Sequence, residues 1–153
     1  MADALSDLIE TLEKLEKPDR EADAELALMA MMPQEVFGDE FGTSSVDGPN
    51  YFYGDAVWAG GGQIWHSPDF TASLDAAIAL VERVLPDHRW LIDKRPFAKD
   101  RHDGYRATCY RQGHPYKSDG SDTPSAWAPT PALALLTALL RAKSALTDAG
   151  GRK

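Results

Sequence analysis

The stretch Thr130-Pro131-Ala132-Leu133-Ala134-Leu135-Leu136-Thr137-Ala138-Leu139-Leu140 is the most regular part of this sequence. Thr130 suits the N-cap of a helix, and Pro131 suits the first helical position, where a missing N–H leaves no hydrogen bond unmade. Leucines recur at helical spacing after it, and Gly150-Gly151 marks an end. We therefore predict a helix over 131–147 whose inward side chains are Leu133, Leu136, Leu139, Leu140 and Leu146.

Two segments before this helix alternate between apolar and polar residues, as strands do. They are residues 89–95 and 105–111. In the second, one face carries Tyr105, Ala107 and Cys109, and the other carries Arg106, Thr108 and Tyr110. We predict a half-buried hairpin, followed by a short third strand at 124–128.

A further helix is predicted over 73–85, because Thr71 or Ser73 can cap it and Pro86 ends it. Residues 72–150 then form an α-β-β-β-α core. The predicted fold class is α+β, in which a three-stranded antiparallel sheet packs against two helices.

The first 32 residues form an acidic helical arm, with one helix from Leu5 and a second over about 18–32 that begins at Pro18. Its methionines at the end of the second helix fit either ordinary packing or a partner site. Residues 33–71 are rich in glycine and aromatic side chains, which predicts loops and short strands. The best strand candidates are 51–53 and 63–66, and a strand from this region can extend the sheet.

Composition limits the class of protein. The chain has 153 residues, of which 43% are hydrophobic and 26% charged, as expected for one soluble globular domain. The single cysteine, Cys109, excludes a disulfide framework. The sequence shows neither a leader pattern nor an apolar run of about 18 residues, so we expect a cytoplasmic protein without a membrane partner.

The net charge of −8 conceals an uneven distribution. Residues 1–80 contain sixteen acids and three bases, a net of −13, whereas 81–153 contain eight acids and thirteen bases, a net of +5. Such asymmetry fits attraction within one molecule, head-to-tail association, or a separate charged partner for each part. We favour the first interpretation, attraction within one molecule, and the sequence leaves open whether the acidic arm folds over the basic hairpin or leaves both exposed.

Three stretches carry a resemblance to known proteins: Pro68-Asp69-Phe70-Thr71-Ala72-Ser73-Leu74-Asp75-Ala76-Ala77, then Trp90, then Ala128-Pro129-Thr130-Pro131-Ala132-Leu133-Ala134-Leu135-Leu136. With them the chain resembles small prophage-encoded hypothetical proteins of the phage ABA sandwich type over about 63–147. Pro18-Asp19-Arg20-Glu21 extends the likeness loosely to 1–32. These motifs hold a helix start and a core face, so the resemblance implies bacteriophage origin and fold rather than an activity.

The acidic arm supports the main functional hypothesis. Glu13, Glu16, Glu21 and Asp23 can present a negative surface, and complementary charge steers association with a basic protein. Together with the resemblance, this predicts a non-catalytic binding protein in the host cell. Its partner is a host or phage protein, for instance a host defence protein that it inhibits. A solvated helix face explains the same residues without a partner.

The alternative is a nucleotide or nucleic-acid binder that uses the basic, aromatic hairpin at 89–117. Cations and stacking rings in one segment suit this role. The predicted face consists of Arg89, Arg95, Arg106, Tyr110 and Arg111. The element order over 72–147 is also that of double-stranded-RNA-binding domains, but the last helix has no base before Arg141. Nucleic acid is therefore the less favoured partner.

A small hydrolase is the third hypothesis. It needs a cleft that joins a histidine to carboxylates, but no serine lies in a G-x-S-x-G pattern and Cys109 falls on the face expected to be buried. The histidines also lack the spacing of a compact metal motif: His66, His88, His102 and His114. We expect no catalytic residues, no metal and no cofactor.

Overall fold

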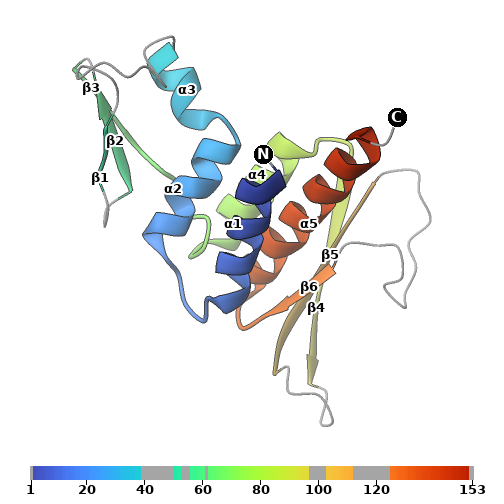
Figure 1. Ribbon diagram of the computed structural model, residues 1–153. Helices are drawn as coiled ribbons and strands as arrows, with labels where there is room; N and C mark the ends of the chain where they lie inside the picture. Colours follow the sequence, from blue (N-terminus) through green and yellow to red (C-terminus); the bar gives the residue numbers. More distant parts are fainter. Residues whose placement is uncertain are drawn as a thin grey trace.

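The computed structural model describes residues 2–38, 50–52, 56–60, 62–96, 103–111 and 125–151, and these contain five helices and six strands (Figure 1). The helices are α1 (Ala2–Lys14), α2 (Arg20–Met29), α3 (Met32–Phe37), α4 (Leu74–Val84) and α5 (Pro131–Gly151). The strands are β1 (Asn50–Phe52), β2 (Val57–Gly60), β3 (Gln63–His66), β4 (His88–Pro96), β5 (Asp103–Arg111) and β6 (Ser125–Ala128). The predicted α+β class is confirmed.

The predicted hairpin and third strand form one antiparallel sheet with the order β4-β5-β6. Cys109 pairs with Trp90, and Ala107 lies between Ile92 and Ala126. Ala107 and Cys109 are buried, as the alternation along their strand predicted, and Ala126 is buried beside them. Small side chains at Ala107 and Ala126 let α5 lie close against the middle of the sheet. Helix α5 is the principal helical cover of this sheet.

Both main helices begin as their sequences predict. The Ser73 hydroxyl accepts a hydrogen bond from the Ala76 N–H at 3.2 Å, and the Thr130 hydroxyl accepts one from the Leu133 N–H at 3.2 Å. Each bond satisfies one of the N–H groups that a first helical turn leaves without a partner. The capping residues therefore determine where α4 and α5 start.

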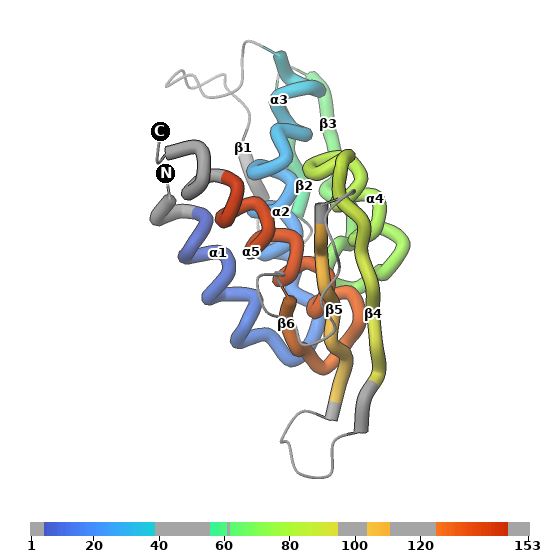
Figure 2. Tube along the Cα trace, turned by 90° about the vertical axis from the view of Figure 1, so that its right-hand side faces the viewer, coloured from blue at the N-terminus to red at the C-terminus, as the bar shows by residue number. Residues whose placement is uncertain are grey.

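Helix α5 is buried on all sides from Ala132 to Leu140. The sheet covers one side of α5, and α1 and α4 cover others; in Figure 2, α1, α5 and the sheet follow one another from left to right. A helix that is apolar all round needs such enclosure. The prediction that Leu146 faces inward is wrong: its side chain is 42% exposed, near the end of the helix.

The acidic segment forms a layer of the fold. Leu8 and Leu12 of α1 and Leu26 of α2 belong to the same buried cluster as α4, α5 and the sheet, which we call the main core. Because α1 packs on α5, that helix separates the acidic layer from the hairpin (Figure 2). The acidic segment therefore does not lie over the basic strands, although Glu13 pairs with Arg141 and Glu35 with Arg83, which joins the acidic part of the chain to the basic part.

The second predicted helix is divided in two. Helix α2 ends at Met29, Met31 takes a left-handed conformation with φ of 60°, and α3 starts at Met32. Pro33 explains the break, since proline disrupts a helix interior but is accommodated in a first turn. The expectation that residues from Pro33 onward are not helical is therefore wrong as far as Phe37.

Strands β1, β2 and β3 form a separate antiparallel sheet with the order β1-β2-β3, so they do not extend the first sheet. The predicted strands at 51–53 and 63–66 correspond to β1 and β3, with Tyr53 outside the described residues. Strand β2 was not predicted. This sheet packs on α2 and α3 through Trp58, Phe37, Ala24 and Ala56, which we call the small cluster.

Candidate functional site

Six exposed carboxylates lie along α1, α2 and the link between them: Asp7, Glu10, Glu13, Glu16, Glu21 and Glu25. We call this set the acidic face. Of the predicted contact residues, Glu16 and Glu21 are exposed and form no ion pair with the described residues. Glu13 is also exposed, but its carboxylate accepts a hydrogen bond from the Arg141 guanidinium of α5 at 2.9 Å.

The structure removes Asp23 from the predicted contact surface, because this side chain is completely buried. Its Oδ1 accepts hydrogen bonds from the Thr71 N–H at 2.7 Å and the Thr71 hydroxyl at 2.8 Å. Its Oδ2 accepts one from Arg20 Nη1 at 2.8 Å. Burial raises the pKa of Asp23, although the bonds from Thr71 and Arg20 oppose this effect. Asp23 therefore holds the fold together and cannot touch a partner.

The bonds around Asp23 join two distant parts of the chain. Arg20 also donates to the carbonyl of Ser67 at 2.9 Å and contacts the carboxylate of Asp69, and the Thr71 hydroxyl accepts from the Asp19 N–H at 2.9 Å. The stretches 18–21 and 68–71, both part of the resemblance, therefore meet here. Their role in this chain is to fix the segment after β3 to the start of α2.

The pKa of Glu25 reflects both its burial and the negative charge of its neighbours on the acidic face. Burial raises the pKa of Glu25, and the nearby carboxylates of Glu21 and Asp19 raise it further. Like charges close together disfavour ionisation, so a cation brought to this place relieves repulsion. Asp19, Glu21 and Glu25 therefore lie close enough together at the start of α2 to repel one another.

The predicted nucleic-acid face is only partly assembled. Arg89 is exposed, and its position pairs with the half-buried Tyr110 across β4 and β5. Arg106 is 12% exposed; it contacts Asp93 at 3.3 Å, and its guanidinium lies 5.8 Å from the centre of the Trp127 ring. The buried Nε of Arg106 has no hydrogen-bond partner among the described residues. Arg95 and Arg111 lie near the ends of their strands, and their side chains are outside the described residues.

Cys109 and the histidines do not form a reactive cluster in the described residues. Cys109 is buried, and burial raises the pKa of its thiol to about 12, so it stays protonated and inert. His66 is exposed on β3 and His88 begins β4, whereas His102 and His114 lie outside the described part. No group of three or more potential metal ligands is found within the described ranges.

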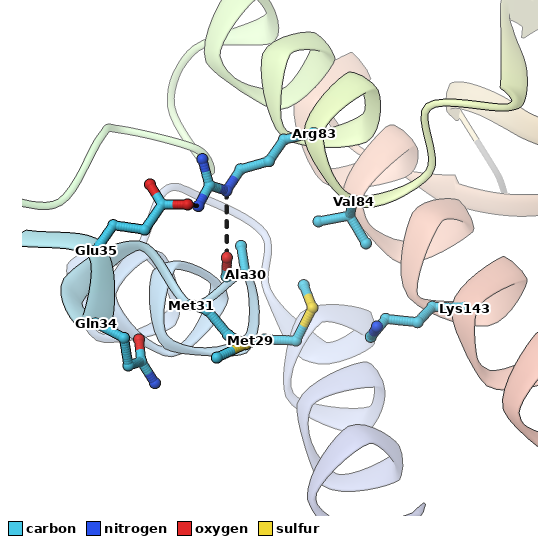
Figure 3. Close-up of a pocket in the computed structure, with 8 residues that line it drawn as sticks. All are labelled: Met29, Ala30, Met31, Gln34, Glu35, Arg83, Val84 and Lys143. Atoms are coloured by element: carbon cyan, nitrogen blue, oxygen red, sulfur yellow. Dashed lines mark hydrogen bonds and ion pairs between the residues drawn. The ribbon is translucent and has the colours of Figure 1, made fainter. Parts of the chain in front are cut away.

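A cavity of about 710 Å³ lies between the α2–α3 junction and the helices α4 and α5 (Figure 3). Its apolar lining consists of Met29, Ala30, Met31 and Val84, and its polar lining of Gln34, Glu35, Arg83 and Lys143. Arg83 is held in place, because its Nε donates to the Ala30 carbonyl at 3.2 Å and its guanidinium contacts Glu35. The lining of the cavity thus combines an apolar wall with two cationic side chains and one carboxylate.

Sequence reasoning missed this cavity, although one signal pointed to it. The methionine-rich end of α2 is visible in the sequence, but both cations come from other helices, 54 and 114 residues after Met29. Only the fold brings them together. Pro33 was the usable signal, since proline disrupts a helix interior. It indicates that the helix breaks among the methionines, at one wall of the cavity.

Comparison of the chain with protein-family models, with curated proteins and with solved structures finds no match. No helix within the described ranges is both long and apolar enough to cross a membrane.

Proposed function

We propose that this protein is a non-catalytic binding protein whose acidic face contacts a basic surface of another protein. One observation carries the proposal: the acidic face and the basic strands lie on opposite sides of α5, so the strands do not neutralise it (Figure 2). Glu16, Glu21 and Glu25 form no ion pair with the described residues. Complementary charge at such a surface speeds association and selects the partner.

The resemblance to prophage-encoded proteins supports a narrower form of this proposal. A phage protein acts in the cytoplasm of its host, and a host defence protein that binds nucleic acid offers a basic groove. Carboxylates along α1 and α2 then occupy that groove in place of phosphates. The revised contact residues are Glu16, Glu21 and Glu25; Glu13 is secondary because it pairs with Arg141, and the buried Asp23 is excluded.

The test is charge reversal with a matched control. Glu16→Lys with Glu25→Lys changes the acidic face by four charge units, while Glu21 is kept because an acid in the first turn stabilises α2. Glu82→Lys with Asp87→Lys makes the same change at exposed sites in and just after α4. Proteins captured from host lysate by the wild type should be lost with the first pair and kept with the second. Equal capture by both pairs would disprove the assignment.

A second candidate function, single-stranded nucleic-acid binding, is favoured by Arg89 beside Tyr110 and by Arg106 over Trp127. The predicted salt slope is about −3.5 if five cations meet phosphates, from about −0.7 per contact. If Arg89 alone engages a phosphate, the slope is about −0.7. Fluorescence titration with a labelled oligonucleotide at several salt concentrations measures it, and no binding at low salt eliminates this function.

A further inference from the structure

Strand β3 is an edge strand without the usual protection. Within the described part of the chain it pairs with β2 alone, and its sheet stands beyond α2 and α3, away from β4-β5-β6 (Figure 1). Proteins commonly protect an open edge with charged side chains or proline. Edge strand β4 carries the exposed Arg89 and Lys94, whereas β3 contains no Lys, Arg, Asp, Glu or Pro. Strand β3 therefore has no charge that would keep another strand away.

The backbone groups of Ile64 and His66 point to the open side of β3. The Ser67 N–H donates to the Ala56 carbonyl at 2.8 Å, which makes these two residues a hydrogen-bonded pair at the end of the β2–β3 ladder. Such pairs alternate with non-hydrogen-bonded pairs along an antiparallel ladder. Ile64 and His66 occupy the non-hydrogen-bonded positions, so they direct their N–H and C=O groups away from β2.

The side chain of Ile64 is also turned away from the rest of the molecule. Trp65 packs against both the main core and the small cluster, so its face of β3 is turned toward the helices. Ile64 lies on the other face, because successive side chains of a strand alternate. Its neighbour on β2 is the small Ala59, and 68% of Ile64 is exposed. An apolar side chain and unprotected backbone groups thus coincide at one residue, in the middle of the edge.

We propose that β3 pairs antiparallel with β3 of a second copy of this chain, with the twofold axis at Ile64. Each Ile64 then exchanges both backbone hydrogen bonds with Ile64 of the other copy, and the two side chains lie next to each other on one face. Trp65 lies opposite Gln63 of the other copy, so no charge meets a like charge within the paired strands.

A second copy suits this edge because β3 is complementary to itself. The chain has a net charge of −8, yet none of its acids lies in β3, where the two copies meet. The contact is four residues long, so the dimer is weak and forms at high protein concentration. The acidic face lies on α1 and α2, so this contact is independent of the proposed function.

Sedimentation equilibrium up to about 1 mM protein measures the association. The wild type should dimerise, and Ile64→Lys should weaken dimerisation at least about tenfold, because two ammonium groups then lie directly opposite each other. Leu146→Lys is the control, since it changes another exposed leucine in the same way on α5 and should dimerise like the wild type. A monomeric wild type, or equal dimerisation of the two variants, overturns the proposal. Circular dichroism verifies that both variants are folded.

Cysteine cross-linking tests the register. Ile64→Cys brings two Cα atoms to about 5.5 Å, within the range of a disulfide. His66→Cys lies on the same face of the same strand, but its two copies are about 14 Å apart in this register, too far to be bridged. The native Cys109 is buried and does not compete. Under mild oxidation Ile64→Cys should form a covalent dimer at least about tenfold faster than His66→Cys. Equal rates overturn the pairing at Ile64.

Salt distinguishes this contact from head-to-tail association of the acidic and basic parts of two copies. Two copies with a net charge of −8 repel each other, and salt screens this repulsion. Pairing through β3 should therefore be unchanged or strengthened between about 0.05 M and about 0.5 M salt, whereas head-to-tail association should weaken. A dimer that dissociates at the higher salt concentration overturns the proposal.

Discussion

The two three-stranded sheets of this chain are held in different ways. The sheet β4-β5-β6 lies on α5, and its inner residues join a main core that also includes α1, α2 and α4. The sheet β1-β2-β3 has shorter strands and rests on the small cluster around Trp58 (Figure 1). The difference teaches that one helix can serve two cores, since Ala22 and Leu26 of α2 join the main core and Ala24 joins the small cluster.

Polar bonds compensate for the small cluster's size. The segment that leaves β3 is fixed to α2 by Asp23, Arg20 and Thr71, which form a buried network beside the main core. The main core therefore depends on apolar packing, and the attachment of the second sheet depends on both packing and this network. Damage to one region should be separable from damage to the other.

The largest effect is expected in the main core. Leu136→Ala removes a completely buried side chain between the sheet and the helical layers, which should lower the free energy of unfolding by about 3–5 kcal/mol. Urea denaturation followed by circular dichroism measures it. Leu146→Ala is the control, because that leucine is 42% exposed and should change stability little. A similar loss for both would contradict the described packing of α5.

Asp23→Ala should have the next largest effect, about 2–3 kcal/mol, because the Thr71 N–H and hydroxyl lose a buried acceptor. Arg20 keeps its contacts with Ser67 and Asp69, which limits the loss. Asp23→Asn retains an acceptor oxygen and should lose less. The same denaturation experiment compares them, and equal losses for the two variants would show that charge, rather than hydrogen bonding, matters at this site.

Trp58→Ala should detach the second sheet while leaving the main core folded. The global free energy of unfolding should fall by only about 1–2 kcal/mol, because the sheet can open locally before the rest unfolds. Hydrogen exchange should show faster exchange in β2 and β3, with protection kept in β5. Loss of protection in β5 to the same extent would mean that the two regions unfold as one.

The difference in pH dependence of stability between the wild type and Asp23→Asn reports on the network. Burial raises the pKa of Asp23 above 3.8, so the folded chain binds this proton more tightly than the unfolded chain. The resulting stabilisation is complete below the unfolded pKa and is lost as the pH rises through the folded pKa. The stability of the wild type relative to Asp23→Asn should therefore decrease as the pH rises above the unfolded pKa of about 4. A relative stability that increases with pH would be the contrary result.

The smallest signal, thiol labelling, separates the two regions most clearly. Cys109 is buried in the main core and its pKa is about 12, so a thiol reagent should react only after global opening. Leu136→Ala should accelerate labelling, whereas Trp58→Ala should accelerate it far less. Rapid labelling of the native wild type would contradict the position of Cys109.

The regular elements could be predicted because local signals agreed with the fold. Ser73 and Thr130 act as caps. The spacing of two residues between Ala107 and Cys109 put both on one face of the strand, and this face is the buried one. Strand β2 was missed because it ends in Ala59 and Gly60, residue types that are depleted in strands. Leu146 was misplaced because helical spacing does not reveal where neighbouring elements end.

The candidate sites depended on information that sequence does not carry. Glu16, Glu21 and Asp23 look alike as acids near a helix start, yet only Asp23 meets Thr71, which lies 48 residues away. Arg106 was expected on an open basic face, and its contacts with Asp93 and Trp127 come from two other strands. In each case a partner from another part of the chain determined whether the charged side chain is bound within the fold or is available at the surface.

The position of α5 between the acidic layer and the strands also gives the molecule an electric dipole moment. Residues 5–29 carry eight acids and three bases, while the described side chains of β4 and β5 carry three Lys or Arg and one Asp. Such a molecule rotates as it approaches a charged body, so that its acidic face arrives first at a positive surface. The burial of one apolar helix therefore also sets the orientation in which the protein meets others, and added salt should diminish that alignment.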